Sequence, residues 1–268
     1  MSKNNSQIIP NRYSLLCLDA GSTMIKAAEY VNGEVQFVCQ GKSIDSVLDE
    51  IKKYTSHKFN EILITGHQQW QQKLQTADWP ASKCTLLDTS YIPETYLNYE
   101  TPDTLGLDRY LVCLGALNSL NREEVGSGVI VVDAGTACTI DSMSGEGVFN
   151  GGVIMPGLSA WENGLRQCTP QLPAVERALP STYPGKTTHS CLQWGLLGSF
   201  TAAIQYHLER LRQQYESGTV MITGGDAKDL LSPLEIPENN HDSLLVFRGM
   251  IGFRRWLVNK PFNFEQDL

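Results

Sequence analysis

Two stretches of the chain share one pattern of apolar and polar positions. In the first, an apolar run at 13–18 ends in Asp-Ala-Gly at 19–21, and an extended run at 23–31 leads through an Asn-Gly turn into a third run. In the second, the apolar run at 129–133 ends in Asp-Ala-Gly at 133–135 and continues through a Ser-Gly turn in the same way. Because Asn-Gly between extended runs is typical of a hairpin, the pattern predicts three successive strands in each copy.

The periodicity elsewhere predicts helices between further strands. Helices are expected at 43–54, 103–121, 157–167, 188–216 and 248–258, and strands at 60–65, 85–92 and 220–223. The glycine-rich residues 147–157 could form an ordinary loop, but Gly-Gly followed by Pro-Gly fits a chain that bends tightly around a ligand. The repeat predicts an α/β protein made of two related domains, and we place the boundary in the polar segment 122–128. This division gives a flexible extension at 1–12 and domains at 13–124 and 125–268.

The two Asp-Ala-Gly turns are candidates for phosphate binding. Each carries an aspartate at a strand end that could reach a metal ion, a glycine that lets main-chain N–H groups approach a phosphate, and a hydroxyl residue, Ser22 or Thr136. A single copy could be a simple turn, but two equivalent copies favour a polyphosphate held by both. Lys26 could point toward that phosphate or into solvent.

A second candidate is the adjacent pair Asp108 and Arg109 near the start of a predicted helix. Such a pair is often just a solvated helix face. It could also supply a general base for an alcohol, with a cation beside it for an anionic substrate. Residues 224–226, Gly-Gly-Asp after a strand, would suit an adenine base or ribose or simply open a helix. Residues 185–187, Gly-Lys-Thr, lack the first glycine and the strand of a phosphate-binding loop of the Walker type.

Composition and charge narrow the classes of partner. The chain has 268 residues, 41% hydrophobic and 19% charged, and a formal net charge of −8, which disfavours nucleic acid and anionic membranes as partners. We expect a cytoplasmic protein, since no signal-peptide core and no apolar run of membrane-spanning length is seen. The seven cysteines form no C-x-x-C pair and predict buried free thiols, and the scattered histidines indicate no metal site.

Taken in order, these segments resemble the type III pantothenate kinases of the actin and sugar-kinase superfamily. The resemblance covers about 14–253 and rests on DAGSTMIK at 19–26, Tyr99, Gly-Leu-Asp-Arg at 106–109, DAGTACT at 133–139, the glycines and proline of 151–157, Leu-Pro at 172–173, Thr188 with Gly195, and TGGDA at 223–227. It implies duplicated actin- or ribonuclease H-like domains with mixed sheets flanked by helices, and ATP in the interdomain cleft.

The resemblance also implies an activity and its cofactors. The expected reaction is ATP-dependent phosphorylation of pantothenate to 4′-phosphopantothenate, the first step of coenzyme A biosynthesis, with Mg²⁺ accompanying ATP and K⁺ or NH₄⁺ as a monovalent cation. A homodimer with the substrate site at its interface is expected.

Site residues follow from the same resemblance. Asp108 would be the general base for the pantothenate hydroxyl, and Asp133 would hold the monovalent cation. Asp19 would also reach Mg²⁺ through a phosphate. The ATP-binding set would be Asp19, Ala20, Gly21, Ser22, Thr23, Met24, Ile25, Lys26 and Thr136. The pantothenate-binding set would be Tyr99, Gly106, Leu107, Asp108, Arg109 and Thr188, with Arg109 near the substrate carboxylate.

Other functions remain open at this point: a non-catalytic regulatory factor of the same fold, a kinase for another small alcohol, and an actin-like filament. The retained carboxylates Asp19, Asp108 and Asp133 favour an enzyme. The chain departs from the family at Leu107, which replaces a usual alanine and is expected to narrow the pocket near the base, and at Thr187, which replaces a usual asparagine.

Overall fold

The computed structural model describes residues 13–258 except 56–57, 67–69, 71–72, 75, 122–125, 127 and 216–217. The extension at 1–12 and most of the boundary segment at 122–128 therefore lie outside the described residues. The chain divides into two compact units, Met1–Leu87 and Asp88–Leu268. Packing thus groups residues 88–121 with the second unit, whereas the sequence places them in the first domain.

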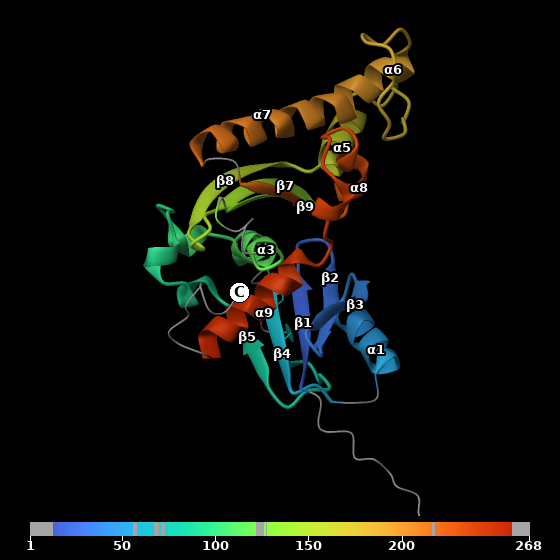
Figure 1. Ribbon diagram of the computed structural model, residues 1–268. Coiled ribbons are helices and arrows are strands. Elements are labelled where there is room, and N and C mark those ends of the chain that lie inside the picture. The colour runs from blue at the N-terminus through green and yellow to red at the C-terminus, as the bar shows by residue number, and fades with distance from the viewer. Residues whose placement is uncertain are drawn as a thin grey trace, which may run out of the picture. The chain divides into compact units, whose positions relative to one another are not determined.

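The first unit is built on a five-stranded sheet of order β3-β2-β1-β4-β5 (Figure 1). Its strands are β1 (Ser14–Ala20), β2 (Ile25–Val31), β3 (Glu34–Gly41), β4 (Glu61–Gly66) and β5 (Cys84–Leu86). β2 and β3 pair antiparallel, while β4 runs parallel to β1 and β5 parallel to β4. The sheet is therefore mixed.

Local sequence explains the hairpin and the helix of this unit. Asn32 and Gly33 join β2 to β3 with φ of 55° and 91°, which the predicted Asn-Gly turn requires. Helix α1 (Ile44–Tyr54) starts at Ser43, whose side chain accepts a hydrogen bond from the Ser46 amide. Its apolar face packs into the core of the first unit.

The second unit repeats the first in strand order and direction. Its four strands are β6 (Val129–Ala134), β7 (Ala137–Met143), β8 (Phe149–Pro156) and β9 (Thr219–Thr223), arranged β8-β7-β6-β9. β6 pairs antiparallel with β7 and parallel with β9, as β1 pairs with β2 and β4. The duplication and the α/β class expected from the sequence are confirmed.

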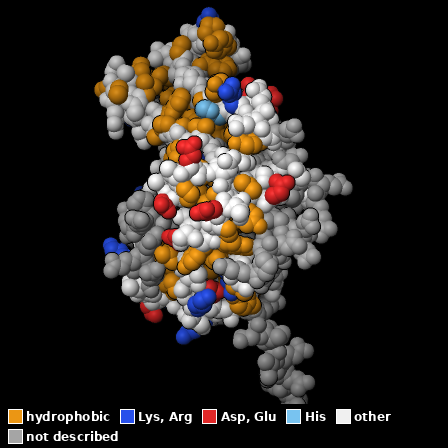
Figure 2. Space-filling model, turned by 90° about the vertical axis from the view of Figure 1, so that its left-hand side faces the viewer, with side chains coloured by type: hydrophobic (Ala, Val, Ile, Leu, Met, Phe, Trp, Pro, Cys, Tyr) orange, Lys and Arg blue, Asp and Glu red, His pale blue; other side chains and the backbone are white. Residues whose placement is uncertain are grey.

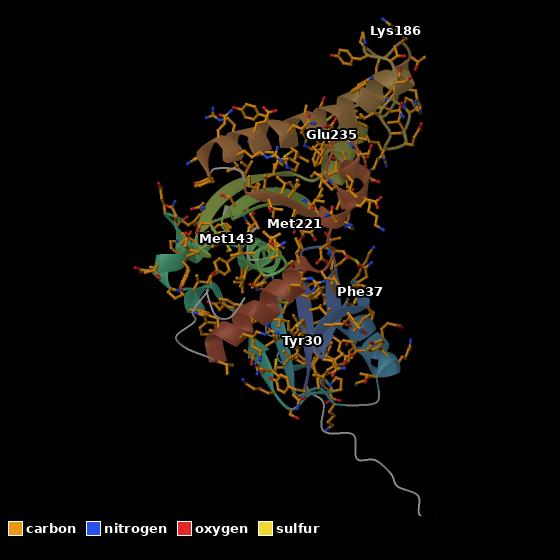
Figure 3. All side chains as sticks on the ribbon, in the orientation of Figure 1. Tyr30, Phe37, Met143, Lys186, Met221 and Glu235 are labelled. Atoms are coloured by element: carbon orange, nitrogen blue, oxygen red, sulfur yellow. The ribbon has the colours of Figure 1, made fainter. Side chains whose placement is uncertain are left out.

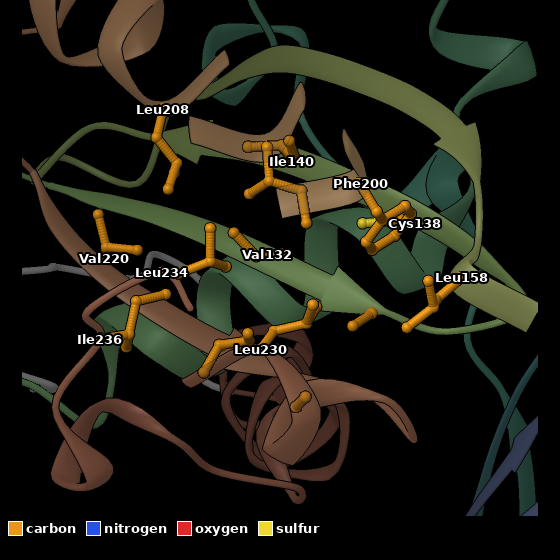
Figure 4. Packing of buried hydrophobic residues seen from close by; sticks show 14 of the residues in the cluster. Val132, Cys138, Ile140, Leu158, Phe200, Leu208, Val220, Leu230, Leu234 and Ile236 are labelled. Atoms are coloured by element: carbon orange, nitrogen blue, oxygen red, sulfur yellow. The ribbon is translucent and has the colours of Figure 1, made fainter. Parts of the chain in front are cut away.

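Helices cover both faces of this second sheet (Figure 1). On one side lie α5 (Leu158–Cys168), α7 (Ser199–Gln214) and α8 (Ala227–Leu231). Figure 4 shows how Phe200, Leu208 and Leu230 from these helices meet Val132 and Ile140 of the sheet. α7 continues directly from α6 (Thr188–Gln193) through one π-helical stretch, Trp194–Gly198. The expected helix at 188–216 is thus two helices joined by a π turn.

The other face carries α3 (Leu107–Leu117) and α9 (Leu245–Val258). The two helices approach closely at two glycines. A Cβ on Gly115 would lie 2.0 Å from the Leu245 carbonyl oxygen, and one on Gly249 would lie 1.9 Å from that of Leu111. Any larger residue would force the helices apart, so these glycines fix the position of α3 in the second unit.

Three predicted elements are wrong in part. The strand expected at 85–92 ends at Leu86, because Asp88 accepts a hydrogen bond from the Ser90 amide and starts a 3-10 turn at Thr89–Tyr91. The helix expected at 103–121 spans only 107–117, after the short turns Glu94–Tyr96 and Pro102–Thr104. The glycine-rich segment 147–157 is no loop, since its residues 149–156 form β8.

The cysteines are free thiols, but only Cys17, Cys113 and Cys138 are buried. Cys84, Cys168 and Cys191 are exposed, so the expectation of buried thiols is wrong for these three. Within the described part of the chain, no helix combines the length and the apolar character needed to span a bilayer.

Candidate active site

The first turn lies at the carboxyl end of β1. Asp19 is the register partner of Lys26 on β2 and of Thr65 on β4, so the three residues occupy neighbouring positions on one face of the sheet. The turn is closed by a hydrogen bond from the Gly21 amide to the Met24 carbonyl, 3.0 Å long. This register brings the lysine that the sequence left undecided to the same sheet face as the aspartate.

The expected ATP-binding residues of this turn differ in what they can offer. Ser22 and Thr23 are exposed and present hydroxyl groups. Ala20 and Ile25 are buried in the core of the first unit, so only their main-chain groups could meet a ligand. Asp19, Gly21, Met24 and Lys26 are half-buried. The turn can therefore act through main-chain amides, two hydroxyls, one carboxylate and one ammonium group.

The sequence analysis missed a second repeated element at this edge. β4 ends in Ile-Thr-Gly at 64–66, and the same three residues recur at 222–224, where β9 ends at Thr223 and Gly224 follows it. Thr65 is paired with Asp19 across the strands, and Thr223 is paired with Asp133. The repeated tripeptide could have shown that each aspartate has a threonine beside it.

The two glycines of this repeat share an unusual backbone conformation. Gly66 has φ of 132° and Gly224 has φ of 97°. A Cβ would lie 2.2 Å from the Ala20 carbonyl oxygen in the first case and 2.5 Å from the Ala134 carbonyl oxygen in the second. Glycine is required at both positions because the chain must pass directly against the turn after the aspartate.

The second turn is built like the first and is held from two sides. Asp133 is half-buried at the end of β6, and Thr136 is exposed. The Thr136 carbonyl accepts a hydrogen bond from the Gly157 amide at 3.2 Å, and the Ala134 carbonyl accepts one from the Asp226 amide at 3.0 Å. The Gly-Gly-Asp segment thus packs directly against this turn and also opens helix α8.

Asp108 occupies the first turn of α3, behind Gly106 at the N-cap. Its side chain is exposed, and one carboxylate oxygen accepts a hydrogen bond from the Arg109 amide at 3.0 Å. Asp108 is accessible to a substrate, as a general base must be.

Arg109, the next residue, is buried and already paired. It is 7% exposed, and its Nε lies 3.2 Å and 3.1 Å from the two carboxylate oxygens of Asp141, which is fully buried. Nη2 also contacts Asp141, and Nη1 donates to the Tyr99 hydroxyl at 3.4 Å. The sequence did not predict Asp141, although a charged residue inside the otherwise buried strand β7 was a signal.

Aromatic rings and two glycines complete the surroundings of this pair. The guanidinium carbon lies 5.9 Å from the Tyr99 ring centroid and 5.7 Å from that of Phe149. Gly151 passes next to the Tyr99 ring, and a Cβ on Gly152 would lie 2.4 Å from an Asp141 carboxylate oxygen. Gly152 therefore makes room for the Asp141 carboxylate. Gly151 has φ of 77°, a conformation that favours glycine, where the pairing of β7 with β8 shifts register.

Burial and neighbouring charges shift the pKa values of two groups here, Asp141 of this pair and Cys113. Burial raises the pKa of Asp141, and the hydrogen bonds and charge of Arg109, with a hydrogen bond from Thr139, offset part of that rise. Burial also raises the pKa of the Cys113 thiol. The negative charge of Asp141 raises this pKa further, the positive charge of Arg109 lowers it, and the negative charge of Asp133 raises it.

Thr188 does not join this group. It is exposed at the first position of α6, and Thr187 acts as the helix cap in a capping box with Ser190. In Figure 1, α6 and α3 stand well apart, on opposite sides of the second sheet. Figure 3 labels Lys186 near the outer tip of this region, and its side chain is exposed. A cap explains why threonine can replace asparagine at 187.

Comparison with known proteins gives one consistent result. The sequence profile described as type III pantothenate kinase matches residues 15–210. A type III pantothenate kinase of Thermosipho africanus is 28% identical over 250 residues, covering 89% of this chain and 97% of the relative. One of Thermosynechococcus vestitus is 35% identical over 183 residues, covering 66% of this chain and 67% of the relative.

Among solved structures, a Baf family transcriptional activator from Campylobacter jejuni aligns with a TM-score of 0.58. The alignment covers 91% of this chain and 99% of that one, at 21% sequence identity. At this level of identity the likeness concerns the fold alone.

Proposed function

The chain belongs to the type III pantothenate kinase family, and from this premise we propose that it transfers the terminal phosphoryl group of ATP to the primary hydroxyl of pantothenate. The products are ADP and 4′-phosphopantothenate, which enters coenzyme A biosynthesis. The observation that carries this proposal is an exposed carboxylate, Asp108, next to a buried and oriented arginine, in a chain with two turns suited to phosphate.

We propose that both Asp-Ala-Gly turns bind ATP. The main-chain amides of residues 20–25, the hydroxyls of Ser22 and Thr23 and the ammonium group of Lys26 suit the phosphates, and Thr136 supplies a hydroxyl from the second unit. Kinases of this family use ATP with a divalent metal. Mg²⁺ is usually held by one or two carboxylates together with the phosphates, and Asp19 fits that role.

Asp108 is the residue we assign as general base. Phosphoryl transfer depends mainly on positioning and charge neutralisation, and the base accepts the proton of the attacking hydroxyl. Gly106 leaves space at the helix start, since a Cβ there would lie 2.5 Å from an Asp108 carboxylate oxygen. The substrate can therefore reach the carboxylate from the side of the N-cap.

Arg109 does not offer two free N–H groups for a bidentate contact with the substrate carboxylate. Its Nε and Nη2 are engaged by Asp141, which leaves Nη1, beside the Tyr99 hydroxyl, to face an anionic substrate. We propose that the pantothenate carboxylate is met by Nη1 of Arg109 together with Tyr99, while Leu107 limits the space near the base.

The proposed reaction is tested by a coupled ADP-release assay. The purified chain is supplied with ATP, Mg²⁺ and K⁺, with and without pantothenate. ADP release that depends on pantothenate is expected. Release with other small alcohols but not with pantothenate would favour a different kinase, and no release from folded protein would favour the regulatory function.

We further propose that Asp133 holds a K⁺ or NH₄⁺ ion. Its carboxylate is half-buried at a strand end, next to the carbonyl groups of a tight turn, and such oxygen ligands suit a monovalent cation. The rate is expected to rise when K⁺ or NH₄⁺ replaces Na⁺, and Asp133→Asn is expected to remove the difference between the cations. Equal wild-type rates in all three salts would contradict this assignment.

The protein is proposed to act as a homodimer with a shared substrate site. Thr188 and Asp108 both belong to the expected substrate set, yet they lie on elements that stand apart in the second unit. A second copy could bring a Thr188 to the Asp108 of the first. Figure 2 shows hydrophobic side chains gathered on the upper part of one face. The second unit also exposes the large side chains of Ile154, Tyr183 and Tyr206. An interface between copies would bury exposed apolar surface of this kind.

Mixing two inactive variants tests this sharing. Asp108→Asn and Thr188→Asp are each expected to impair catalysis as pure dimers. When the two are co-expressed, half of the dimers are mixed and each mixed dimer holds one intact site, so about a quarter of the wild-type activity is expected. If both residues act within one chain, the mixed dimers have no intact site and the mixture stays inactive.

A further inference from the structure

Arg177 lies on the connection between α5 and α6, outside every set of residues discussed above. Its guanidinium binds two segments at once. Nε and Nη2 donate to the two Glu162 carboxylate oxygens of α5 at 2.8 Å and 3.0 Å, and Nη2 also donates to Ser159 at 2.8 Å. Nη1 donates to Asp226 at 2.7 Å and to Asp229 at 3.0 Å.

Asp226 binds Arg177 through its side chain instead of capping its own helix. It stands at the N-cap of α8, where an aspartate usually accepts a hydrogen bond from the first turn of its own helix. Its side chain makes no such capping bond and is turned to Arg177 instead. Through Arg177 the carboxylate therefore links the Gly-Gly-Asp segment to α5, rather than capping the short helix that follows it.

The Gly-Gly-Asp segment is also held by main-chain hydrogen bonds, including those from the Ala227 amide to the Gly224 carbonyl and from the Asp229 amide to the Asp226 carbonyl. Gly224 passes against the Ala134 carbonyl, and the Asp226 amide donates to the same carbonyl. Gly225 is exposed and has no side chain. Both glycines are conformationally permissive, so the segment depends on contacts beyond its own sequence for a fixed shape.

From these contacts we infer that Arg177 is a positioning residue for nucleotide binding, which it serves by fixing the 224–226 segment against the second Asp-Ala-Gly turn. The inference rests on the proposed function only in assigning ATP as the ligand of that turn. Arg177 places one positive charge among three carboxylates, those of Glu162, Asp226 and Asp229, and so weakens their mutual repulsion.

Kinetics of Arg177→Gln test this inference. Losing the charged hydrogen bonds to the segment is expected to raise the KM for ATP by about 10-fold to 100-fold. The KM for pantothenate and the kcat at saturating ATP should stay near wild type, because Asp108 and Arg109 lie on a different helix. Arg177→Lys keeps the charge and should recover part of the loss. Arg210→Gln is the matched control, because it removes an exposed arginine of α7 in the same unit.

A second measurement does not need catalysis. Binding of a non-hydrolysable ATP analogue, followed by calorimetry without pantothenate, should weaken by the same factor in Arg177→Gln and not in Arg210→Gln. If Arg177→Gln does not fold, Asp226→Ala removes the acceptor at the other end of the same link and should weaken analogue binding in the same way.

The outcomes separate this inference from the proposed reaction. A wild-type chain that binds the analogue but releases no ADP with pantothenate would overturn the reaction, while weaker analogue binding by Arg177→Gln would still support the inference. Unchanged analogue affinity in the folded variant, an equal rise in both KM values, or a wild-type chain that binds no analogue would overturn it.

Discussion

Replacing Asp108 by Asn is expected to lower the turnover of pantothenate by about 10²-fold to 10⁴-fold, the range that general-base catalysis contributes. The amide has the size of the carboxylate but cannot accept the proton of the attacking hydroxyl. Asp108 is exposed in the first turn of α3, so the change should leave the fold intact. Initial rates at saturating ATP and pantothenate measure the effect.

Two controls make this result specific. Asp103→Asn removes a neighbouring exposed carboxylate from the turn before α3 and should leave turnover near wild type. The affinity of Asp108→Asn for an ATP analogue should also be unchanged, because the proposed phosphate-binding turns follow strands β1 and β6, whereas Asp108 lies on helix α3. Near-full turnover in Asp108→Asn would exclude this residue as the base.

Local sequence was sufficient to predict the duplicated strands. The Asn32-Gly33 turn and the apolar runs around it specify a hairpin within about twenty residues, and the same pattern returns after Asp133. The helix cap at Ser43 likewise acts within one turn of α1. Such features depend on neighbours in the chain, so a sequence pattern can carry them.

The contacts of the expected site residues could be predicted only in part, because their partners are distant in the sequence. Arg109 was expected near the substrate carboxylate, but its main partner in the fold is 32 positions away on β7 and was not predicted. That partner, Asp141, could be suspected only as a charge in a buried strand. Residues 147–157 were expected to bend around a ligand, whereas Gly152 leaves room for Asp141, a residue of the neighbouring strand β7.

Asp141→Asn is expected to destabilise the second unit by about 3–5 kcal/mol, the usual cost of leaving one charge of a buried ion pair uncompensated. Arg109 and Asp141 are almost wholly removed from water, so the arginine charge would have no solvent to replace its partner. Urea unfolding followed by circular dichroism measures the loss. A folding free energy equal to that of wild type would show that water or another group takes the place of Asp141.

Replacing both charges separates stability from function. A buried ion pair can often be exchanged for apolar side chains of similar volume at little cost, so Arg109→Met combined with Asp141→Leu should recover most of the stability that Asp141→Asn loses. Turnover should not recover, because the proposed contact of Nη1 with the substrate carboxylate is absent from the double variant. Since apolar residues would fill this space equally well, a stable but inactive double variant would mean that the pair is retained to hold an oriented cation beside Asp108. An active double variant would instead make the pair purely structural and remove Arg109 from the substrate site.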